Sequence, residues 1–378
     1  MPETARSLEA LAQAAGDVLV RVDGDPNTQV SGIEYDSRRI SGGELFFCIP
    51  GRVQDGHTFA AEAAAGGAAA LCVERPTGAG LPEVVVSDGR PAMARIAAAW
   101  WGNPGDELVV IGITGTNGKT TTAYLVEAIL AADGRTTGLV GTIETRLADE
   151  RRPGVRTTPE SVDLQRLLSE MRARKVDAVA MEVTSHGLAL DRVEGLHFAA
   201  SAFTNLTQDH LDFHGSMEEY FAAKRALFTP ERSDRGAVNL DDPHGRVLKE
   251  TVTIPCVGYG VVAGDAEVRA VDVTTGAQGS TFAITTPKGD VRIVTPLVGG
   301  FNVANCVGAA AVALQTGIDL EAIEAGLGSV QSVPGRFESV DAGQPFVVVV
   351  DYAHTPDSLD NVLRSARVLT NKDGRVIC

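Results

Sequence analysis

Apolar positions in the middle of the chain follow two patterns, one typical of buried strands and one typical of helices. Residues 108–114 and 176–183 are almost continuously apolar, as strands of a parallel sheet are when helices cover both faces. Residues 119–132 instead carry apolar side chains on one helical stripe. Further strands are expected at 196–204 and 236–239. This alternation predicts a doubly wound α/β sheet.

The regions on either side of this pattern differ from it. In the first region a helix is expected at 60–70 and short strands at 32–35, 45–49, 69–73 and 84–86. A second helix at 91–101 stops at the breaker Gly102-Asn103-Pro104-Gly105, and we place the first domain boundary at residue 90. Residues 251–296 alternate and are rich in Thr and Val, which predicts a small antiparallel addition before a helix at 302–315.

A third region begins near Pro334. It predicts a strand at 346–350, a helix at 357–369 and the opening of another strand at 375–378. A βαβ unit needs its second strand and the neighbours of that strand. We therefore expect an incomplete third domain at 334–378, after an N-terminal domain at 1–90 and a central domain at 91–333.

Composition narrows the class of protein. The 378 residues are 44% hydrophobic, but no apolar run approaches the roughly 20 residues of a membrane span, and the start lacks the pattern of a signal peptide. A cytoplasmic protein is expected. The formal charge of −16 argues against a nucleic-acid partner. The five cysteines are scattered without a CxxC pair, which indicates neither a zinc site nor a disulfide framework.

A glycine-rich turn joins the strand at 108–114 to the helix that follows it. The turn reads Gly115-Thr116-Asn117-Gly118-Lys119-Thr120-Thr121, the short GxxGKT form, because Ile113 stands where the common P-loop has its first glycine. Backbone N–H groups and the helix N-terminus favour phosphate, Lys119 can reach the terminal phosphates, and Thr120 can place its hydroxyl on Mg²⁺. The alternative is a plain βα turn with a solvated lysine. The strand before and the helix after favour nucleotide binding.

Polar residues follow two other strands. Glu182 ends the strand at 176–183, where a carboxylate suits Mg²⁺, and His186 comes soon after it. The loop at 204–214 holds His210, His214 and two aspartates, which either bind a metal or form ordinary hydrogen bonds.

A lysine occupies the apolar face of the next expected helix. A capping box, Ser216 with Glu219, starts this helix, and Lys224 follows Tyr220 by four residues on the buried stripe. One interpretation is that the ammonium reaches solvent along its aliphatic stem. The other is a desolvated lysine with a lowered pKa that becomes carbamylated and adds an anionic group beside the metal.

These segments, in this order, resemble the Mur ligases. The matching strings are GTNGKTT (115–121), TTPE (157–160), MEVTSHGL (181–188), NLTQDHLDFHG (205–215), YFAAKRALF (220–228), GGFNVANC (299–306), PGRFE (334–338) and DYAHTPDSL (351–359). They are long, collinear and spread over nearly the whole chain. The N-terminal segment at 34–57 and the TTPE string resemble the members that extend a UDP-linked muramoyl dipeptide.

The resemblance implies a three-domain α/β architecture and an activity. The N-terminal domain would bind UDP, the central P-loop domain ATP, and the Rossmann-like C-terminal domain an amino acid. ATP would phosphorylate the γ-carboxylate of D-glutamate in UDP-N-acetylmuramoyl-L-alanyl-D-glutamate. A diamino acid would then attack the acyl phosphate in peptidoglycan synthesis. We expect meso-diaminopimelate, because it is the more frequent substrate in the family. Since the family's diamino-acid pocket would lie beyond residue 378, we expect residues 1–378 to bind the dipeptide precursor without forming product.

The resemblance also assigns roles to residues. Lys119 would hold phosphate, and Lys224 would be an N6-carboxylysine. The magnesium ligands would be Thr120, Glu182 and His210. The muramoyl dipeptide would contact Thr157, Thr158, Thr184 and Arg192. The UDP end would contact Tyr35, Ser37, Arg52, Val53 and Gln54. The nucleotide would also face Asn302, Arg336, Asp351 and His354.

Other functions are compatible with parts of the sequence. An L-lysine-adding enzyme, a sister Mur ligase and a folylpolyglutamate-type ligase share the chemistry. From other classes, a P-loop kinase or NTPase switch fits the phosphate loop alone, and a non-catalytic precursor-binding protein fits an incomplete chain. A kinase would leave a stable phosphoproduct, a ligase an amide plus phosphate, and a binding protein neither.

Overall fold

The computed structural model describes residues 5–51, 53–370 and 374–378. The chain folds into two compact units. The first contains residues up to Glu107 together with two later segments, Pro159–Ala173 and Gly187–Leu196. The second contains Leu108–Thr158, Arg174–His186 and His197–Cys378. The predicted domain boundaries, 1–90, 91–333 and 334–378, stay a prediction.

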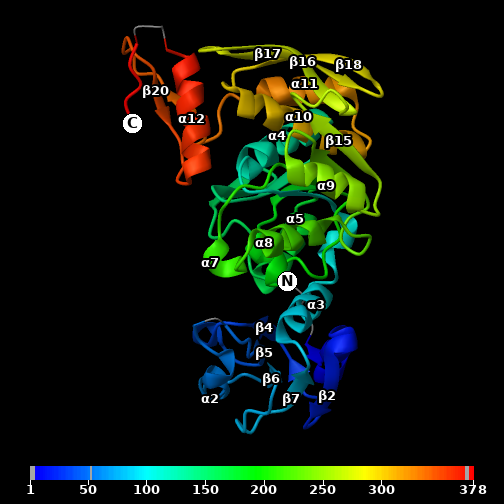
Figure 1. Ribbon diagram of the computed structural model, residues 1–378. Coiled ribbons are helices and arrows are strands. Elements are labelled where there is room, and N and C mark those ends of the chain that lie inside the picture. Colours follow the sequence, from blue (N-terminus) through cyan, green and yellow to red (C-terminus); the bar gives the residue numbers. More distant parts are fainter. Residues whose placement is uncertain (1–4, 52, 371–373) are drawn as a thin grey trace. The chain divides into compact units, whose positions relative to one another are not determined.

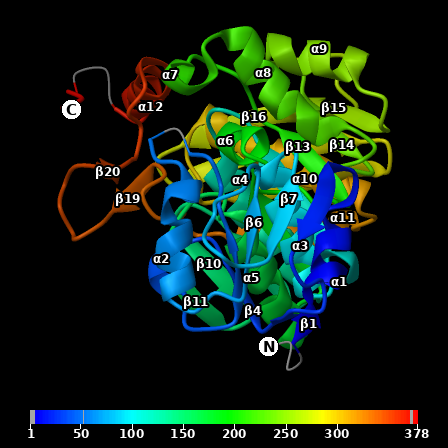
Figure 2. The ribbon, with the colours of Figure 1, turned by 90° about the horizontal axis from the view of Figure 1, so that it is seen from below.

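The first unit is a five-stranded sheet between helices. Its strand order is β2 (Leu19–Asp23), β7 (Glu83–Val86), β6 (Ala70–Val73), β5 (Glu44–Phe47) and β4 (Gly32–Glu34). The last four are parallel and β2 is antiparallel to β7. Every residue of β5, β6 and β7 is buried, because α1 (Leu8–Ala14) and α3 (Gly89–Trp100) pack on one face and α2 (Ala60–Ala65) on the other (Figure 2). The helix that the sequence assigned to the central domain, α3, thus belongs to this unit's core.

The second unit is built on an eleven-stranded mixed sheet. Its centre is parallel and contains, in spatial order, β9 (Thr137–Val140), β12 (Ala178–Glu182), β8 (Val109–Thr114), β13 (Ala200–Phe203), β14 (Gly236–Asn239), β15 (Cys256–Gly260) and β16 (Val268–Gly276). Antiparallel strands extend both edges. They are β10 (Glu144–Leu147) and β11 (Glu150–Pro153) beside β9, and β17 (Gly279–Thr286) and β18 (Gly289–Thr295) beside β16. The doubly wound α/β prediction and the antiparallel addition are confirmed.

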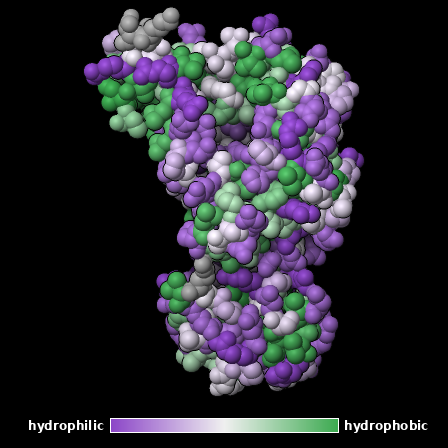
Figure 3. Space-filling model, in the orientation of Figure 1, coloured by the Kyte–Doolittle hydropathy of each residue, from purple (hydrophilic) through white to green (hydrophobic). Residues whose placement is uncertain are grey.

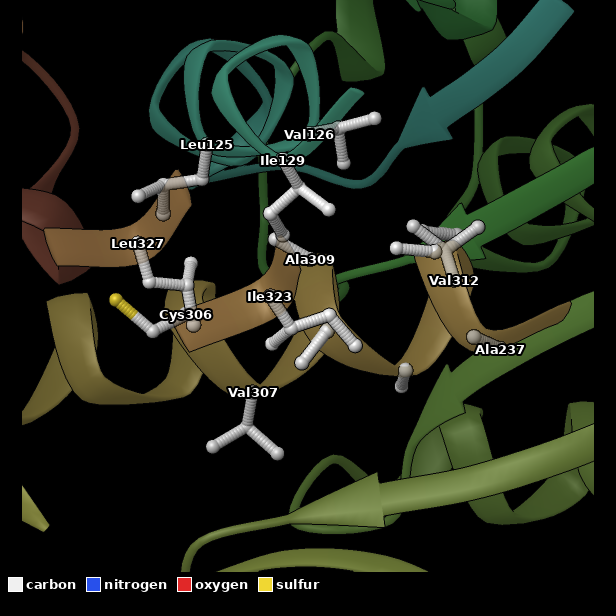
Figure 4. Close-up of a cluster of buried hydrophobic side chains, with 14 of the residues drawn as sticks. Leu125, Val126, Ile129, Ala237, Cys306, Val307, Ala309, Val312, Ile323 and Leu327 are labelled. Carbon is white, nitrogen blue, oxygen red and sulfur yellow. The ribbon is translucent and has the colours of Figure 1, made fainter. Parts of the chain in front are cut away.

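Helices cover both faces of this sheet (Figure 1). The helices α4 (Lys119–Ala132), α10 (Gly300–Gln315) and α11 (Leu320–Ser329) lie on one face, and α8 (Met217–Arg225) and α9 (Pro243–Thr251) on the other. Figure 4 shows Ile129 of α4, Ala309 of α10 and Ile323 of α11 in one buried cluster, each completely shielded from solvent. This apolar contact holds the phosphate-loop helix against the sheet.

The C-terminal segment departs from the sequence prediction. The strand β20 (Val348–Val350) pairs antiparallel with β19 (Glu338–Val340), which the sequence did not indicate, and α12 (Pro356–Val368) follows. The strand expected at 375–378 is wrong, since residues 374–378 are irregular; β19 is the only strand partner of β20 in the part of the chain described. Apolar surface gathers over this segment in Figure 3. Phe346 and Val347 of this segment are 65% and 55% exposed.

Candidate active site

The turn between β8 and α4 forms a phosphate loop that only glycine permits at two positions. Gly115 has φ +147°, and a Cβ there would lie 1.9 Å from Thr204 Oγ1. Gly118 has φ +84°, and a Cβ there would lie 2.4 Å from Asn305 Oδ1. Within the described structure no side chain caps α4, so the first N–H groups of this helix face the site.

The neighbouring loop after β13 holds the phosphate loop in place. Thr116 N–H donates to the carbonyl of Asn205 over 2.9 Å, and Asn117 N–H donates to the Asn205 side chain over 2.9 Å. Thr204 Oγ1 donates to the carbonyl of Asn117 over 2.6 Å. The loop is therefore organised by fixed hydrogen bonds in the protein alone.

Two lysines meet behind this loop. Lys119 Nζ donates to the carbonyls of Gly115 and Thr116 over 2.9 and 2.7 Å. Lys224, on α8, is 1% exposed and its Nζ donates to the same Gly115 carbonyl over 2.8 Å. Burial, and next the positive charge of Lys119, lower the pKa of Lys224 well below its ordinary value. Lys224 does not reach solvent along its stem.

Glu182 lies at the carboxyl end of β12 beside the phosphate loop. Its carboxylate is buried and accepts hydrogen bonds from Thr120 Oγ1 over 3.0 Å and from Thr142 N–H over 2.8 Å. A Cβ at Gly141 would lie 2.5 Å from this carboxylate, so the backbone after β9 approaches it closely. A buried carboxylate is thereby held against the hydroxyl of the loop threonine.

His210 comes from the loop after β13 and has a left-handed backbone, φ +52°. Partial burial lowers its pKa, opposed by Asp209. Its ring lies edge-on to His186, with centroids 4.6 Å apart. His210 and His186 therefore belong to one ring cluster beside the loop.

A cavity of about 460 Å³ collects most of these groups. The sequence-predicted residues that line it are Thr116, Asn117, Gly118, Lys119, Thr120, Thr121, Thr157, Glu182, Thr184, His210, Arg336, Asp351 and His354. Two predicted residues lie just behind its wall: Gly115 and Lys224. Thr158 is also buried there and accepts the N–H of Thr184 over 3.0 Å.

The segment after α11 contributes a cation to the cavity. Arg336 donates to Thr120 Oγ1 over 3.0 Å, and its guanidinium lies 5.2 Å from the ring centroid of Tyr352. The Asp351 carboxylate accepts the N–H groups of Phe337 and Ala353 over 2.7 and 2.6 Å, which shapes the turn that carries Arg336.

The structure also adds residues that sequence reasoning missed. Thr142 follows β9, whose short buried run gave no clear signal, and it bonds Glu182 and Thr157. Asn305 lines the cavity, whereas the predicted Asn302 is 2% exposed and donates to the carbonyl of Val298. One helical turn separates the two asparagines, and a sequence pattern alone cannot choose between them.

The residues predicted for the UDP end belong to the first unit. Tyr35 donates to Asp163 over 2.5 Å, and Ser37 begins a short 3₁₀ turn. Val53 is 96% exposed, and Gln54 accepts the N–H of Gly51 through its carbonyl. Arg52 lies outside the described residues. Arg192, predicted for the dipeptide, forms an ion pair with buried Glu160 at 2.7 Å.

Comparison with known proteins accounts for the phosphate loop and the buried lysine in one chain. The Mur ligase middle domain matches residues 113–313, the catalytic domain of the Mur ligase family matches 29–101, and the Mur ligase glutamate ligase domain matches 335–378. This chain belongs to the Mur ligase family. The resemblance inferred from the motifs is confirmed.

Two relatives of this Mur ligase share one name. The UDP-N-acetylmuramoyl-L-alanyl-D-glutamate--2,6-diaminopimelate ligases of Geobacillus kaustophilus and Streptomyces coelicolor are each 47% identical to it. The alignments cover 93% and 96% of this chain and 73% of each relative.

Solved structures agree on the architecture. A UDP-N-acetylmuramoyl-L-alanyl-D-glutamate--2,6-diaminopimelate ligase superposes with a TM-score of 0.82 and 27% identity over 98% of this chain and 75% of that one. MurF from Acinetobacter baumannii gives 0.72 and 25% identity over 97% and 78%. The folylpolyglutamate synthase of Mycobacterium tuberculosis shares the fold, with a TM-score of 0.61 and 19% identity. The superposition covers 73% of this chain and 70% of that one. The three-domain Mur ligase fold class is confirmed.

Among the described residues, no helix combines the length and apolarity needed to cross a membrane.

Proposed function

We propose that this Mur ligase uses ATP to join a diamino acid, 2,6-diaminopimelate, to UDP-N-acetylmuramoyl-L-alanyl-D-glutamate. The observation that carries the ATP-dependent step is one cavity that holds Lys119, Thr120, Glu182 and Arg336 around the N-terminus of α4. The diamino acid and the muramoyl precursor are inferred from the names of the relatives at 47% identity.

The first chemical step is phosphoryl transfer. A carboxylate oxygen of the glutamate forms a bond to the γ-phosphorus of ATP, the bond to the β-γ bridging oxygen breaks, and ADP leaves. Lys119 and Arg336 supply positive charge where negative charge develops on the transferring group, and the N–H groups at the start of α4 hold the phosphates. For this step Lys119 must exchange its contacts with the Gly115 and Thr116 carbonyls for phosphate oxygens.

The second step forms the amide. The neutral amino group of the diamino acid attacks the acyl carbon, phosphate leaves with the electron pair of the broken C–O bond, and the nitrogen loses a proton. The protein contributes mainly by positioning the reactants and excluding water.

The residues in the cavity fit a magnesium ion. Thr120 Oγ1 and the Glu182 carboxylate are hard oxygen ligands 3.0 Å apart, and His210 lines the same cavity. In the described part of the chain, no group of three or more His, Cys, Asp or Glu side chains is placed to hold a metal alone. We therefore assign Thr120, Glu182 and His210 as magnesium ligands that act together with phosphate and water oxygens. Bound there, Mg²⁺ would neutralise phosphate charge.

Product analysis tests the function. The full-length protein is incubated with ATP, Mg²⁺, the UDP-muramoyl dipeptide and either meso-diaminopimelate or L-lysine. The expected products are ADP, phosphate and the UDP-muramoyl tripeptide in equal amounts, with diaminopimelate preferred. A stable phosphorylated product would identify a kinase instead, and tight binding of the dipeptide without turnover would identify a precursor-binding protein.

A further inference from the structure

Tyr220 occupies the wall between the phosphate loop and Lys224. It lies on α8, one helical turn before Lys224, and is 1% exposed. Its helix is anchored by Ser216, whose side chain accepts the N–H of Glu219 over 3.2 Å. A side chain on this stripe is expected to face the core. Tyr220 is thus part of the packed core behind the loop.

The phenol oxygen of Tyr220 contacts the phosphate loop rather than solvent. It lies 3.0 Å from Thr116 Oγ1, which donates to the carbonyl of Thr207 over 3.2 Å and accepts the Thr207 N–H over 3.0 Å. Because the Thr116 hydroxyl proton is used on Thr207, the phenol is the donor to Thr116. Burial raises the pKa of Tyr220 to about 12, so the phenol keeps this proton at neutral pH. One threonine thereby links α8, the phosphate loop and the loop that carries His210.

The ring of Tyr220 serves a second neighbour. Lys224 Nζ lies 4.6 Å from the ring centroid, a distance at which an aromatic face contacts cations and the N–H groups of a neutral amine. The same Nζ donates to Gly115 O, while Lys119 Nζ donates to Thr116 O. Tyr220 therefore touches, through two different parts of one side chain, the residues that set the shape of the loop behind both lysines.

A residue that only fills the core would not need this hydroxyl, because phenylalanine has the same ring. We propose that Tyr220 is a positioning residue for the ligase reaction, which holds Thr116 and thereby keeps the phosphate loop in its nucleotide-binding shape. The inference rests on the proposed function, since it assumes that this loop binds ATP.

The test compares Tyr220→Phe with the parent protein by calorimetric titration with ATP and Mg²⁺. Loss of one buried hydrogen bond should weaken ATP binding by about 3- to 10-fold. In the assay of the full-length protein, the KM for ATP should rise by the same factor. The kcat at saturating ATP and the KM for the UDP-muramoyl dipeptide should change less than about twofold.

A matched control is Tyr124→Phe. Tyr124 is also buried and also donates its phenol proton to a side chain, Glu144, over 2.7 Å, but it does not line the ATP cavity. Loss of the Tyr124 hydroxyl should leave ATP affinity unchanged. A merely structural role for Tyr220 predicts instead that both variants lose thermal stability and keep their ATP affinity.

A double-mutant cycle identifies the partner. Thr116→Ala alone should weaken ATP binding, and Tyr220→Phe in the Thr116→Ala background should add almost nothing, since the shared contact is already lost. Fully additive effects, or a Tyr220→Phe variant that binds ATP as the parent does, would overturn the inference. If Tyr220→Phe does not fold, unchanged affinity in Thr116→Ala overturns it equally. A parent protein that fails to bind ATP would instead refute the proposed function.

Discussion

Lys119 and Lys224 share one backbone acceptor. Their Nζ atoms lie 2.9 and 2.8 Å from the carbonyl oxygen of Gly115, where Lys224 is 1% exposed and Lys119 is partly buried. Two ammonium groups on one oxygen repel each other. Burial lowers the pKa of Lys119 and holds the pKa of Lys224 well below its ordinary value. Lys119 faces the cavity, where a bound phosphate would favour its charged form, so we expect Lys224 to be the neutral lysine.

The first prediction is that Lys224 carries a carbamate on Nζ in the active protein. A neutral buried amine is nucleophilic. Its nitrogen forms a bond to the carbon of CO₂ and loses one proton to solvent, which leaves a carbamate anion beside the positive Lys119. Lys224→Ala should abolish activity, and added bicarbonate or a short carboxylate should partly restore it. Carbon-13 NMR after labelling with bicarbonate should show a carbamate signal. An unmodified ammonium in an experimental structure of the active enzyme would remove the idea.

The second prediction concerns stability against pH in CO₂-free buffer. The folded pKa of Lys224 lies below its unfolded value, so between these two values the unfolded state binds one proton more. The free energy of unfolding should therefore rise with pH in that window, by about 1.4 kcal/mol per pH unit from this group. Lys224→Met removes the contribution. The free energy of unfolding of the Lys224→Met variant and of the parent is measured with urea at pH 7, 8 and 9. The amount by which the variant exceeds the parent should shrink as the pH rises. A constant difference would mean that Lys224 keeps its proton.

The third prediction concerns phosphate. Lys119→Ala in the full-length enzyme should lower turnover by at least about 10²-fold, because a donor aimed at developing phosphoryl charge is lost. Lys288→Ala, in the exposed turn between β17 and β18, is the control and should leave turnover unchanged. Near-normal turnover of the Lys119 variant would contradict the ATP assignment.

The fourth prediction concerns the metal. Glu182→Gln should keep the fold, since the amide oxygen can still accept from Thr142 N–H, but it should raise the Mg²⁺ concentration for half-maximal activity by at least about 10-fold. Glu127→Gln removes another largely shielded carboxylate, paired with Arg146 outside the cavity, and should leave the Mg²⁺ dependence unchanged. Equal Mg²⁺ curves for Glu182→Gln and the parent would show that the metal binds elsewhere.

Sequence patterns predicted best those features that depend on strand ends and helix periodicity. The pattern predicts Glu182 at the end of a buried sheet strand, and that strand, β12, is the neighbour of β8, which leads into the phosphate loop. Lys224 was predicted on the buried stripe of its helix, and it is 1% exposed. These relations depend on local pattern and on a general rule of sheet topology.

Other features depend on contacts between distant segments. The edge strands β10 and β11 are rich in charge, and the largely shielded Arg146 pairs there with Glu127 and Glu144 at 2.9 and 2.7 Å. Thr142 and Asn305 acquire their places from the close approach of β9 and α10 to the loop. The strand expected at 375–378 had a suitable local pattern, but no pairing forms it among the described residues.

The last prediction tests how the phosphate-loop helix is held. At Gly326 of α11, a Cβ would lie 2.5 Å from Ile129 Cα and 2.7 Å from Ile129 N in α4. Backbone atoms cannot rotate away, so Gly326→Ala must push the two helices apart and loosen the cluster of Ile129, Ile323 and Leu327. The expected loss is about 1–3 kcal/mol in the free energy of unfolding. Gly300→Ala, also in a helix but with no atom within 4 Å of its Cβ, should cost nothing. The free energy of unfolding of both variants and of the parent is measured with urea. Equal stability of Gly326→Ala and Gly300→Ala would mean that α4 and α11 are not in close backbone contact. The position of the phosphate loop would then not depend on that contact.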